Sequence, residues 1–141
     1  MIPTHLIIHH SASDSGLTFE QIRANHLERG WSDIGYHYVI DVAGCTFKGR
    51  PDSVVGAHAL GINQTSLGIC CIGNFEIEQP PAIQFEVLVE LVKKLSAQFN
   101  ISRDAIQGHC DITCAEREYR KSSCPGKFLY QRLGEIRDLV S

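Results

Sequence analysis

Two short apolar runs, far apart in the chain, restrict the fold more than any other sequence feature. The first extends from His5 to His10, and the second extends from Ser66 to Ile72, where Gly73 ends it. A continuous apolar run of this length, bounded by a turn residue, is typical of a buried strand. We therefore expect both runs as strands of one sheet, with the second in a central position.

The chain between these runs carries the signals of a first helix. Thr18 is a good N-cap, and Gln21 follows it at the spacing of a capping box. Gly30 supplies a residue that can stop the helix in a left-handed conformation. These signals predict a helix from Thr18 to Arg29.

A second, longer helix is expected after Pro80 and Pro81, closing at Asn100. Apolar residues recur there at spacings of three and four, which gives the helix one apolar face. These residues are Phe85, Leu88, Val89, Val92, Leu95 and Phe99. A third helix is expected after Pro125 and Gly126. Its apolar face would contain Leu129, Leu133, Ile136 and Val140.

The remaining elements complete a mixed pattern of strands and helices. Residues Tyr36–Asp41 and Cys45–Lys48 are expected as a hairpin, and Ile106–His109 as a short last strand. The fold class is therefore α/β, with a mixed central β-sheet flanked by helices. A chain of 141 residues with 43% apolar composition fits a single domain over residues 1–141.

The charge balance and the hydropathy exclude several kinds of partner. The 13 Lys and Arg are scattered and outnumbered by 16 Asp and Glu, which is not the pattern of a nucleic-acid binder. No apolar run approaches the ~20 residues that span a bilayer. Residues Met1 to His5 lack the basic and apolar regions of a signal peptide. We expect a monomer without nucleic-acid or membrane partners and without an export signal.

The cysteines are expected as thiols or metal ligands. A disulfide framework belongs to exported proteins, so in this chain we predict no structural disulfide. Cys70 and Cys71 are neighbours in the second apolar run, where free cysteine behaves as a small core residue. The six cysteines are Cys45, Cys70, Cys71, Cys110, Cys114 and Cys124.

Seven histidines in a chain of this length raise the question of a metal site. His9 and His10 are consecutive on a predicted strand, so their side chains point to opposite faces and only one can serve a given site. His109 ends another predicted strand, and Cys124 precedes the last helix. Two imidazoles and one thiolate suit Zn²⁺ and leave its fourth position for water. These residues follow no short metal-binding spacing, so ordinary core or surface histidines remain an alternative.

Eight short motifs, which together cover nearly the whole chain from about Leu6 to about Leu133, add a second line of argument. They are Ile7–Ala12, Arg29–Tyr38, Gly49–Pro51, Gly56–His58, Ser66–Ile69, Ile72–Phe75, Gly108–His109 and Cys124–Gly126. In this order they resemble the type 2 zinc amidases, the family of phage T7 lysozyme and animal peptidoglycan recognition proteins. The resemblance implies that family's fold, with a long central helix packed on a mixed sheet. It also implies zinc-dependent hydrolysis of the amide between N-acetylmuramic acid and L-alanine in peptidoglycan.

Residue by residue, the resemblance also implies a site. The zinc ligands would be His9, His109 and Cys124. Tyr36 matches the tyrosine that lies beside the metal and assists at the zinc-bound water or at the oxyanion. Ser122 stands where the family often has Lys or Thr, and its hydroxyl can donate a hydrogen bond but brings no positive charge. If a lysine is needed, Lys121 or Lys127 is the alternative, although neither is in register.

The spacer between the last two ligands departs from the family, because residues 110–123 make it longer than usual. It contains Cys114, an alternative third ligand that lacks the Pro-Gly following Cys124. We expect the extra residues to form a surface loop near the mouth of the site. A flap that contacts the substrate is the alternative.

Two further residues are expected to contact the substrate. His58, in a Gly-Ala-His loop, is a candidate for the glycan or the stem peptide, with a surface histidine as the alternative. Asn74, after a strand and a glycine, is a candidate for a hydrogen bond to the peptide, with a turn residue as the alternative. His37 is expected in a core or supporting role, and His26 in a structural one.

The expected function is that of an N-acetylmuramoyl-L-alanine amidase of the phage or prophage endolysin kind. Such a protein would wait in the host or bacterial cytoplasm before its release to the cell wall. The alternatives are a peptidoglycan-binding recognition protein without turnover and a bacterial cell-wall recycling amidase. Non-catalytic relatives commonly lack the third ligand, so the presence of Cys124 favours an enzyme.

Overall fold

A five-stranded sheet forms the centre of the computed structural model, which describes residues 1–112 and 122–140. The strand order is β3-β2-β4-β1-β5. The parallel strands are β1 (His5–His10), β2 (Tyr38–Ile40), β4 (Ser66–Cys71) and β5 (Ile106–Gly108). β3 (Thr46–Lys48) runs antiparallel to β2. Both apolar runs are therefore strands, and the run from Ser66 has the central position that we expected.

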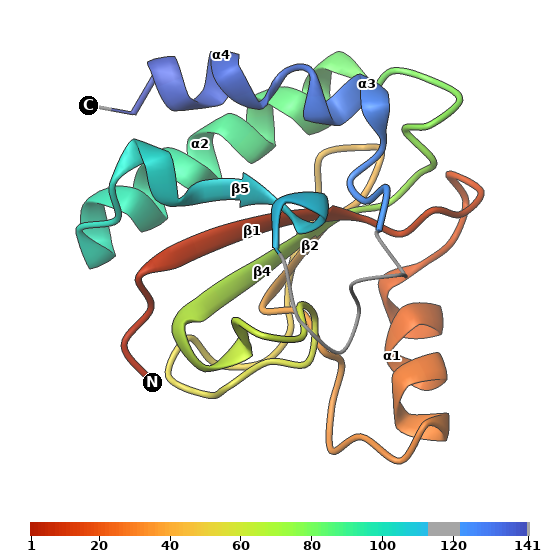
Figure 1. Ribbon diagram of the computed structural model, residues 1–141. Helices are drawn as coiled ribbons and strands as arrows, with labels where there is room; N and C mark the ends of the chain where they lie inside the picture. Colours follow the sequence, from red (N-terminus) through yellow and green to blue (C-terminus); the bar gives the residue numbers. More distant parts are fainter. Residues whose placement is uncertain (113–121, 141) are drawn as a thin grey trace.

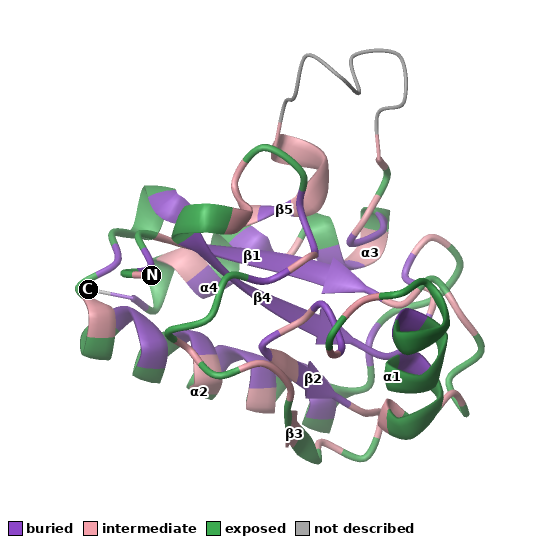
Figure 2. Cartoon of the chain, turned by 90° about the horizontal axis from the view of Figure 1, so that it is seen from below, coloured by how far each residue is buried: buried purple, intermediate pink, exposed green. Residues whose placement is uncertain are grey.

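Helices cover both faces of this sheet (Figure 1). α2 (Ala82–Phe99), α3 (Lys127–Tyr130) and α4 (Leu133–Asp138) lie on one face, and α1 (Phe19–Glu28) lies on the other. Short 3-10 turns occur at Asn63–Thr65, Arg103–Ala105 and His109–Asp111. Figure 2 shows the central strands buried along their length, while the outer sides of the helices are exposed. The predicted mixed sheet flanked by helices is confirmed.

The two faces of the sheet pack into separate apolar clusters. On the α2 face, strand residues such as Leu6, Ile8 and Ile69 meet the apolar face of α2. The buried α2 residues of this cluster are Phe85, Leu88, Val89, Val92 and Leu95. On the other face, a smaller cluster joins α1 to the sheet. Its buried members are Ile22, Ile34, Val39, Cys70 and Ile72.

The helix ends follow the chemistry expected from the sequence. The Gln21 amide donates to the Thr18 hydroxyl at 3.1 Å, and the Thr18 amide donates to the Gln21 side chain at 2.9 Å, which completes the capping box. Gly30 has a φ of 88°, and Asn100 closes α2 with a φ of 55°. Both values lie in the left-handed region that ends helices.

Several boundaries differ from the prediction: β2 ends at Ile40, β3 begins at Thr46 and β4 ends at Cys71, each one residue inside the expected range. β2 begins at Tyr38, because the carbonyls of Tyr36 and His37 accept hydrogen bonds from the loop amides of Arg50 and Gly49. β5 ends at Gly108, so the residue after it lies in a 3-10 turn. The expected third helix is two short helices, α3 and α4. Its four apolar residues are nevertheless all buried: Leu129, Leu133, Ile136 and Val140.

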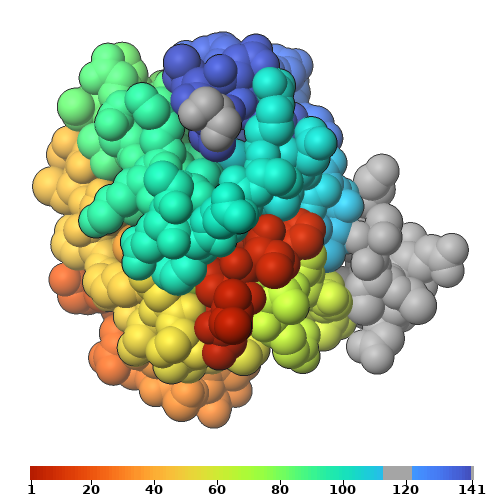
Figure 3. All heavy atoms as spheres, turned by 90° about the vertical axis from the view of Figure 1, so that its left-hand side faces the viewer, coloured from red at the N-terminus to blue at the C-terminus, as the bar shows by residue number. Residues whose placement is uncertain are grey.

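The space-filling view shows how the two ends of the chain are placed (Figure 3). The C-terminal segment, in blue, lies beside α2, and the N-terminal residues, in red, lie at the surface next to the segment that follows α2. Among the helices of residues 1–112 and 122–140, none combines the length and hydropathy needed to cross a membrane. Cys70 and Cys71 are buried free thiols, one in each apolar cluster, as expected.

Candidate metal and substrate site

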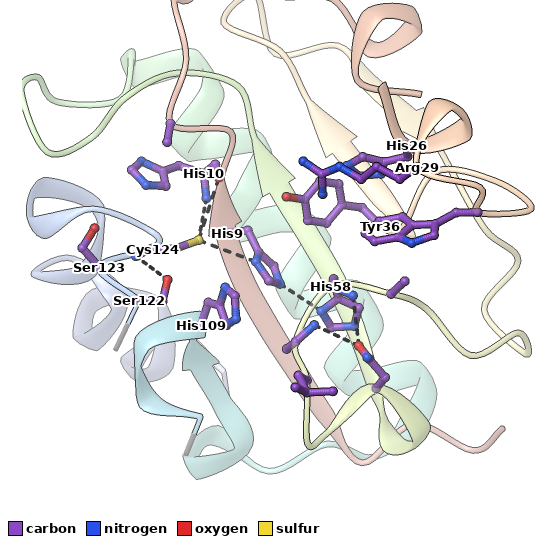
Figure 4. Close-up of a pocket in the computed structure, with 16 residues that line it drawn as sticks. His9, His10, His26, Arg29, Tyr36, His58, His109, Ser122, Ser123 and Cys124 are labelled. Atoms are coloured by element: carbon purple, nitrogen blue, oxygen red, sulfur yellow. Dashed lines mark hydrogen bonds between the residues drawn. The ribbon is translucent and has the colours of Figure 1, made fainter. Parts of the chain in front are cut away.

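The candidate ligands meet at the carboxyl ends of two adjacent parallel strands, where sites in open sheets are commonly built. Ile8 of β1 pairs with Gly108, the last residue of β5, so His9 and His109 follow at the same edge. Cys124 reaches this edge from the segment before α3. The ligand atoms of the three residues all lie within 4.8 Å of one another (Figure 4). The alternative ligand Cys114 lies outside the described residues.

Two glycines let the Cys124 segment approach the sheet closely. A Cβ added to Gly126 would lie 2.5 Å from backbone that follows β4, and one added to Gly108 would lie 2.8 Å from Pro125. The His10 amide also donates to the Cys124 sulfur at 3.3 Å. The Pro-Gly after the cysteine is therefore the part of the motif that seats the third ligand against β1 and β5.

The donor set fits a zinc ion. His9 Nδ1 lies 3.6 Å from Cys124 Sγ, close to the separation of two ligands on one tetrahedral ion with Zn–N of about 2.0 Å and Zn–S of about 2.3 Å. Burial lowers the pKa of His9 well below its ordinary value, so the imidazole is neutral and has a lone pair to offer. Burial also raises the pKa of the Cys124 thiol to about 12, so a thiolate at neutral pH needs a cation beside it.

His10 points away from this group, as the strand period predicts. Its Nδ1 accepts a hydrogen bond from the Phe75 amide at 3.1 Å. Figure 4 shows the ring turned to the side opposite His9. The register of the histidine pair is therefore the expected one, with His9 at the candidate metal site.

A pocket of about 460 Å³ opens beside the three ligands. Besides the ligands and His10, it is lined by Ala12, His26, Arg29, Trp31, Tyr36, Ala57, His58, Ala59, Leu60, Asn63, Ser122 and Ser123. The ring centroid of Tyr36 lies 5.1 Å from that of His9. Burial raises the pKa of Tyr36 well above its ordinary value, so its hydroxyl stays a hydrogen-bond donor.

Ser122 also lines the pocket, beside the third ligand. Its hydroxyl accepts a hydrogen bond from the Cys124 amide at 3.1 Å, which leaves the hydroxyl proton available to a further acceptor. Of the two alternative lysines, Lys127 is exposed and does not line the pocket, and Lys121 lies outside the described residues. The extra spacer residues, expected as a surface loop, also lie largely outside them.

The two predicted substrate contacts have different positions. His58 lines the pocket as a buried side chain, and its Nδ1 lies 2.9 Å from His9 Nε2. Asn74 is not brought to the pocket. Its Oδ1 accepts a hydrogen bond from the Glu76 amide at 3.1 Å, a contact that agrees with the alternative interpretation as a turn residue.

Two polar residues of the pocket wall were missed by reasoning from the sequence. Asn63 accepts hydrogen bonds from the amides of His58 and Ala59, at 3.0 and 2.9 Å. Arg29 Cζ lies 5.4 Å from the centroid of the Trp31 ring, and both residues line the pocket. Arg29 is the first residue of the motif Arg29–Tyr38, and Asn63 lies five residues after the motif Gly56–His58, which is the signal that could have indicated them.

His37 and His26 have the supporting roles that we expected. His37 is fully buried, accepts from the Gly68 amide at 3.0 Å and donates from Nε2 to the Val54 carbonyl at 2.7 Å. His26 accepts from the Gly35 amide at 2.9 Å. Each ring therefore fixes backbone around the pocket.

Comparisons with known proteins agree on the family. A family model described as N-acetylmuramoyl-L-alanine amidase matches residues 1–127. The chain is 31% identical to a peptidoglycan-recognition protein of Drosophila simulans, over 94% of this chain and 74% of that protein. It is also 31% identical to the endolysin of Escherichia phage T7, over 96% of this chain and 88% of that one.

Structural comparison gives the same result. The structure of the N-acetylmuramoyl-L-alanine amidase LysC from Clostridium intestinale superposes with a TM-score of 0.86 and 32% identity, over 100% of this chain and 88% of that one. The chain therefore belongs to the type 2 N-acetylmuramoyl-L-alanine amidase family. This membership supports the function of either a peptidoglycan amidase or a peptidoglycan-binding protein.

Proposed function

We propose that the protein is a zinc-dependent amidase that cleaves the bond between N-acetylmuramic acid and the L-alanine of the stem peptide. The observation that carries the proposal is the convergence of the His9, His109 and Cys124 ligand atoms within 4.8 Å, at the wall of an open pocket that also presents Tyr36. A protein that only binds peptidoglycan does not need two imidazoles and a buried thiol close enough together to coordinate one metal ion. A protein that binds without turnover is the second candidate.

The chain's own side chains would support hydrolysis in distinct ways. Zinc held by the three ligands would polarise the amide carbonyl and lower the pKa of its water to about 7. Tyr36, which stays protonated, would donate a hydrogen bond to the carbonyl oxygen as negative charge grows on it. Ser122, which also lines the pocket, would donate a second, weaker hydrogen bond.

We also propose an endolysin role, supported by the resemblance to the phage T7 endolysin. In this role the protein would be made in the cytoplasm of the host or bacterium, would reach the wall on release, and would act on peptidoglycan as a monomer.

The test is digestion of purified sacculi, followed by identification of the new ends by mass spectrometry. The zinc-loaded protein should release free lactyl carboxylates together with free L-alanine amines. The Cys124→Ala variant is the matched control and should bind sacculi without cutting them. Wild-type protein that binds sacculi and creates no new ends would establish the second candidate. New reducing sugars would establish a different bond specificity.

A further inference from the structure

A line of hydrogen bonds leads from His9 through His58, which also lines the pocket, and into the protein. His9 Nε2 lies 2.9 Å from His58 Nδ1, and His58 Nε2 lies 3.2 Å from the Ser66 hydroxyl. The Ser66 hydroxyl donates to the Ile62 carbonyl oxygen at 2.7 Å. The three side chains are all buried, so water does not compete for these bonds.

The direction of each bond follows from the last acceptor. The Ile62 carbonyl only accepts, so it takes the single proton of the Ser66 hydroxyl, and that hydroxyl must accept from His58 Nε2. A neutral His58 with its proton on Nε2 has a lone pair on Nδ1. The bond between the two rings must then be donated by His9 Nε2. His9 Nδ1 is left with its lone pair, and this is the nitrogen that faces Cys124 Sγ at 3.6 Å.

The surroundings of His58 hold its ring in this position. The ring lies directly over Gly68 of β4, where an added Cβ would come within 2.5 Å of His58 Cγ. Asn63 accepts from the His58 amide at 3.0 Å and so fixes the backbone at the same residue. Only a glycine at this place in the strand leaves room for the imidazole behind His9.

We propose that His58 is a positioning residue for the metal site, because it accepts the Nε2 proton of His9 and so fixes the tautomer in which Nδ1 faces the metal. This inference rests on the zinc site proposed above. A ligating imidazole usually gives its second N–H to a carboxylate, a carbonyl or water, and loss of that partner typically weakens metal binding by ~10–100-fold. Here a second imidazole takes that place. A substrate contact through a ring nitrogen of His58 would require one of these bonds to break.

The test measures zinc affinity by competition with a chromophoric chelator at pH 7.5. His58→Ala should weaken zinc binding by about 10–100-fold. His58→Asn should recover most of the loss, because its Oδ1 can accept the same proton near the position of Nδ1. His37→Ala is the matched control: this ring is also buried and bonds to Gly68 and Val54 but not to His9, so zinc affinity should stay close to wild type.

A second measurement needs no variant. Nitrogen chemical shifts of the histidine rings in the metal-free wild-type protein should place the His9 proton on Nε2. A His9 proton on Nδ1 would overturn the inference. If the wild-type protein binds zinc and His58→Ala binds it equally tightly, the inference is also overturned. A wild-type protein that binds no zinc overturns the proposed function as well, so the two failures are distinguishable.

Discussion

The face of the sheet that packs on α2 differs in character from the face that carries His9. On the α2 face, the side chains of Leu6, Ile8 and Ile69 are fully buried in a continuous apolar cluster. On the other face, His9 borders the pocket, the His58 ring lies over Gly68, and only a small cluster joins α1 to the strands. Consecutive residues of β1 therefore have different roles, because one packs in the core under α2 and the next faces the candidate metal site. Changes on the α2 face should alter stability, whereas changes on the His9 face should alter zinc binding and catalysis.

The largest effect is expected for His9→Ala, compared with His10→Ala on the opposite face. His9→Ala should abolish amidase activity and zinc retention, because it removes a ligand. His10→Ala should keep zinc, because its ring bonds to the Phe75 amide and takes no part in the ligand group. Bound zinc and turnover of sacculi are measured on the same samples. Loss of zinc only in His10→Ala would mean that the two faces are assigned the wrong way round.

The next effect concerns Tyr36 and Ser122, on the pocket side. Tyr36→Phe keeps the ring and removes one donor to the oxyanion, which typically costs ~10²–10³ in rate, or about 3–4 kcal/mol. Ser122→Ala should cost about tenfold, because a neutral hydroxyl contributes a weaker hydrogen bond. Both losses should appear mainly in kcat. Near wild-type turnover by zinc-replete Tyr36→Phe would remove this tyrosine from the mechanism.

Leu88→Ala probes the α2 face. The side chain is fully buried, and truncation of such a leucine costs about 3–5 kcal/mol of unfolding free energy. Urea unfolding of the metal-free protein measures this loss. The zinc affinity of the folded protein should stay at the wild-type value. A change in zinc affinity as large as that of a pocket variant would show that the two faces are coupled.

The smallest effect is the pH dependence of stability in the metal-free protein. Burial lowers the pKa of His58 from 6.5 to about 3 and lowers that of His9 as well. Below pH 6.5 the unfolded chain therefore binds more protons than the folded one, and stability falls as the pH falls. Each imidazole that stays neutral in the folded state costs about 1.4 kcal/mol at one pH unit below 6.5.

The predicted fall in stability is tested by measuring the midpoint of urea unfolding between pH 7.5 and 5.5 with a chelator present. The midpoint should decrease as the pH falls. His58→Asn lacks one of the buried imidazoles and should show a shallower slope. A midpoint that is constant, or that rises as the pH falls, would contradict the prediction.

The sequence was sufficient for elements whose pattern is local. The capping box at Thr18 and the apolar face of α2 depend on residues three and four apart, so they predict helices without knowledge of the rest of the fold. The break between α3 and α4 has no such signal, because the apolar period continues across it. Strand order likewise has no local signal, so the adjacency of β1 and β5 emerged only in the structure.

The sequence indicated the candidate metal ligands, but it indicated fewer of the other residues that line the pocket. The motifs around His9 and Cys124 could be matched residue by residue, and the structure brings both together with the third candidate. The two asparagines show the limit of this reasoning. Asn74 and Asn63 both follow turn-like sequence, and only packing shows that Asn63 holds the pocket wall while Asn74 caps a turn elsewhere.

The position of β1 between β4 and β5 has a consequence for how the chain is made. The ribosome produces β1 first, yet both of its neighbours, Ser66–Cys71 and Ile106–Gly108, are synthesised much later. His9 and the cysteine it faces are separated by 115 positions along the chain. A nascent or prematurely terminated polypeptide that stops before Cys124 lacks one of the three candidate ligands, and under the proposed function it could not cut peptidoglycan.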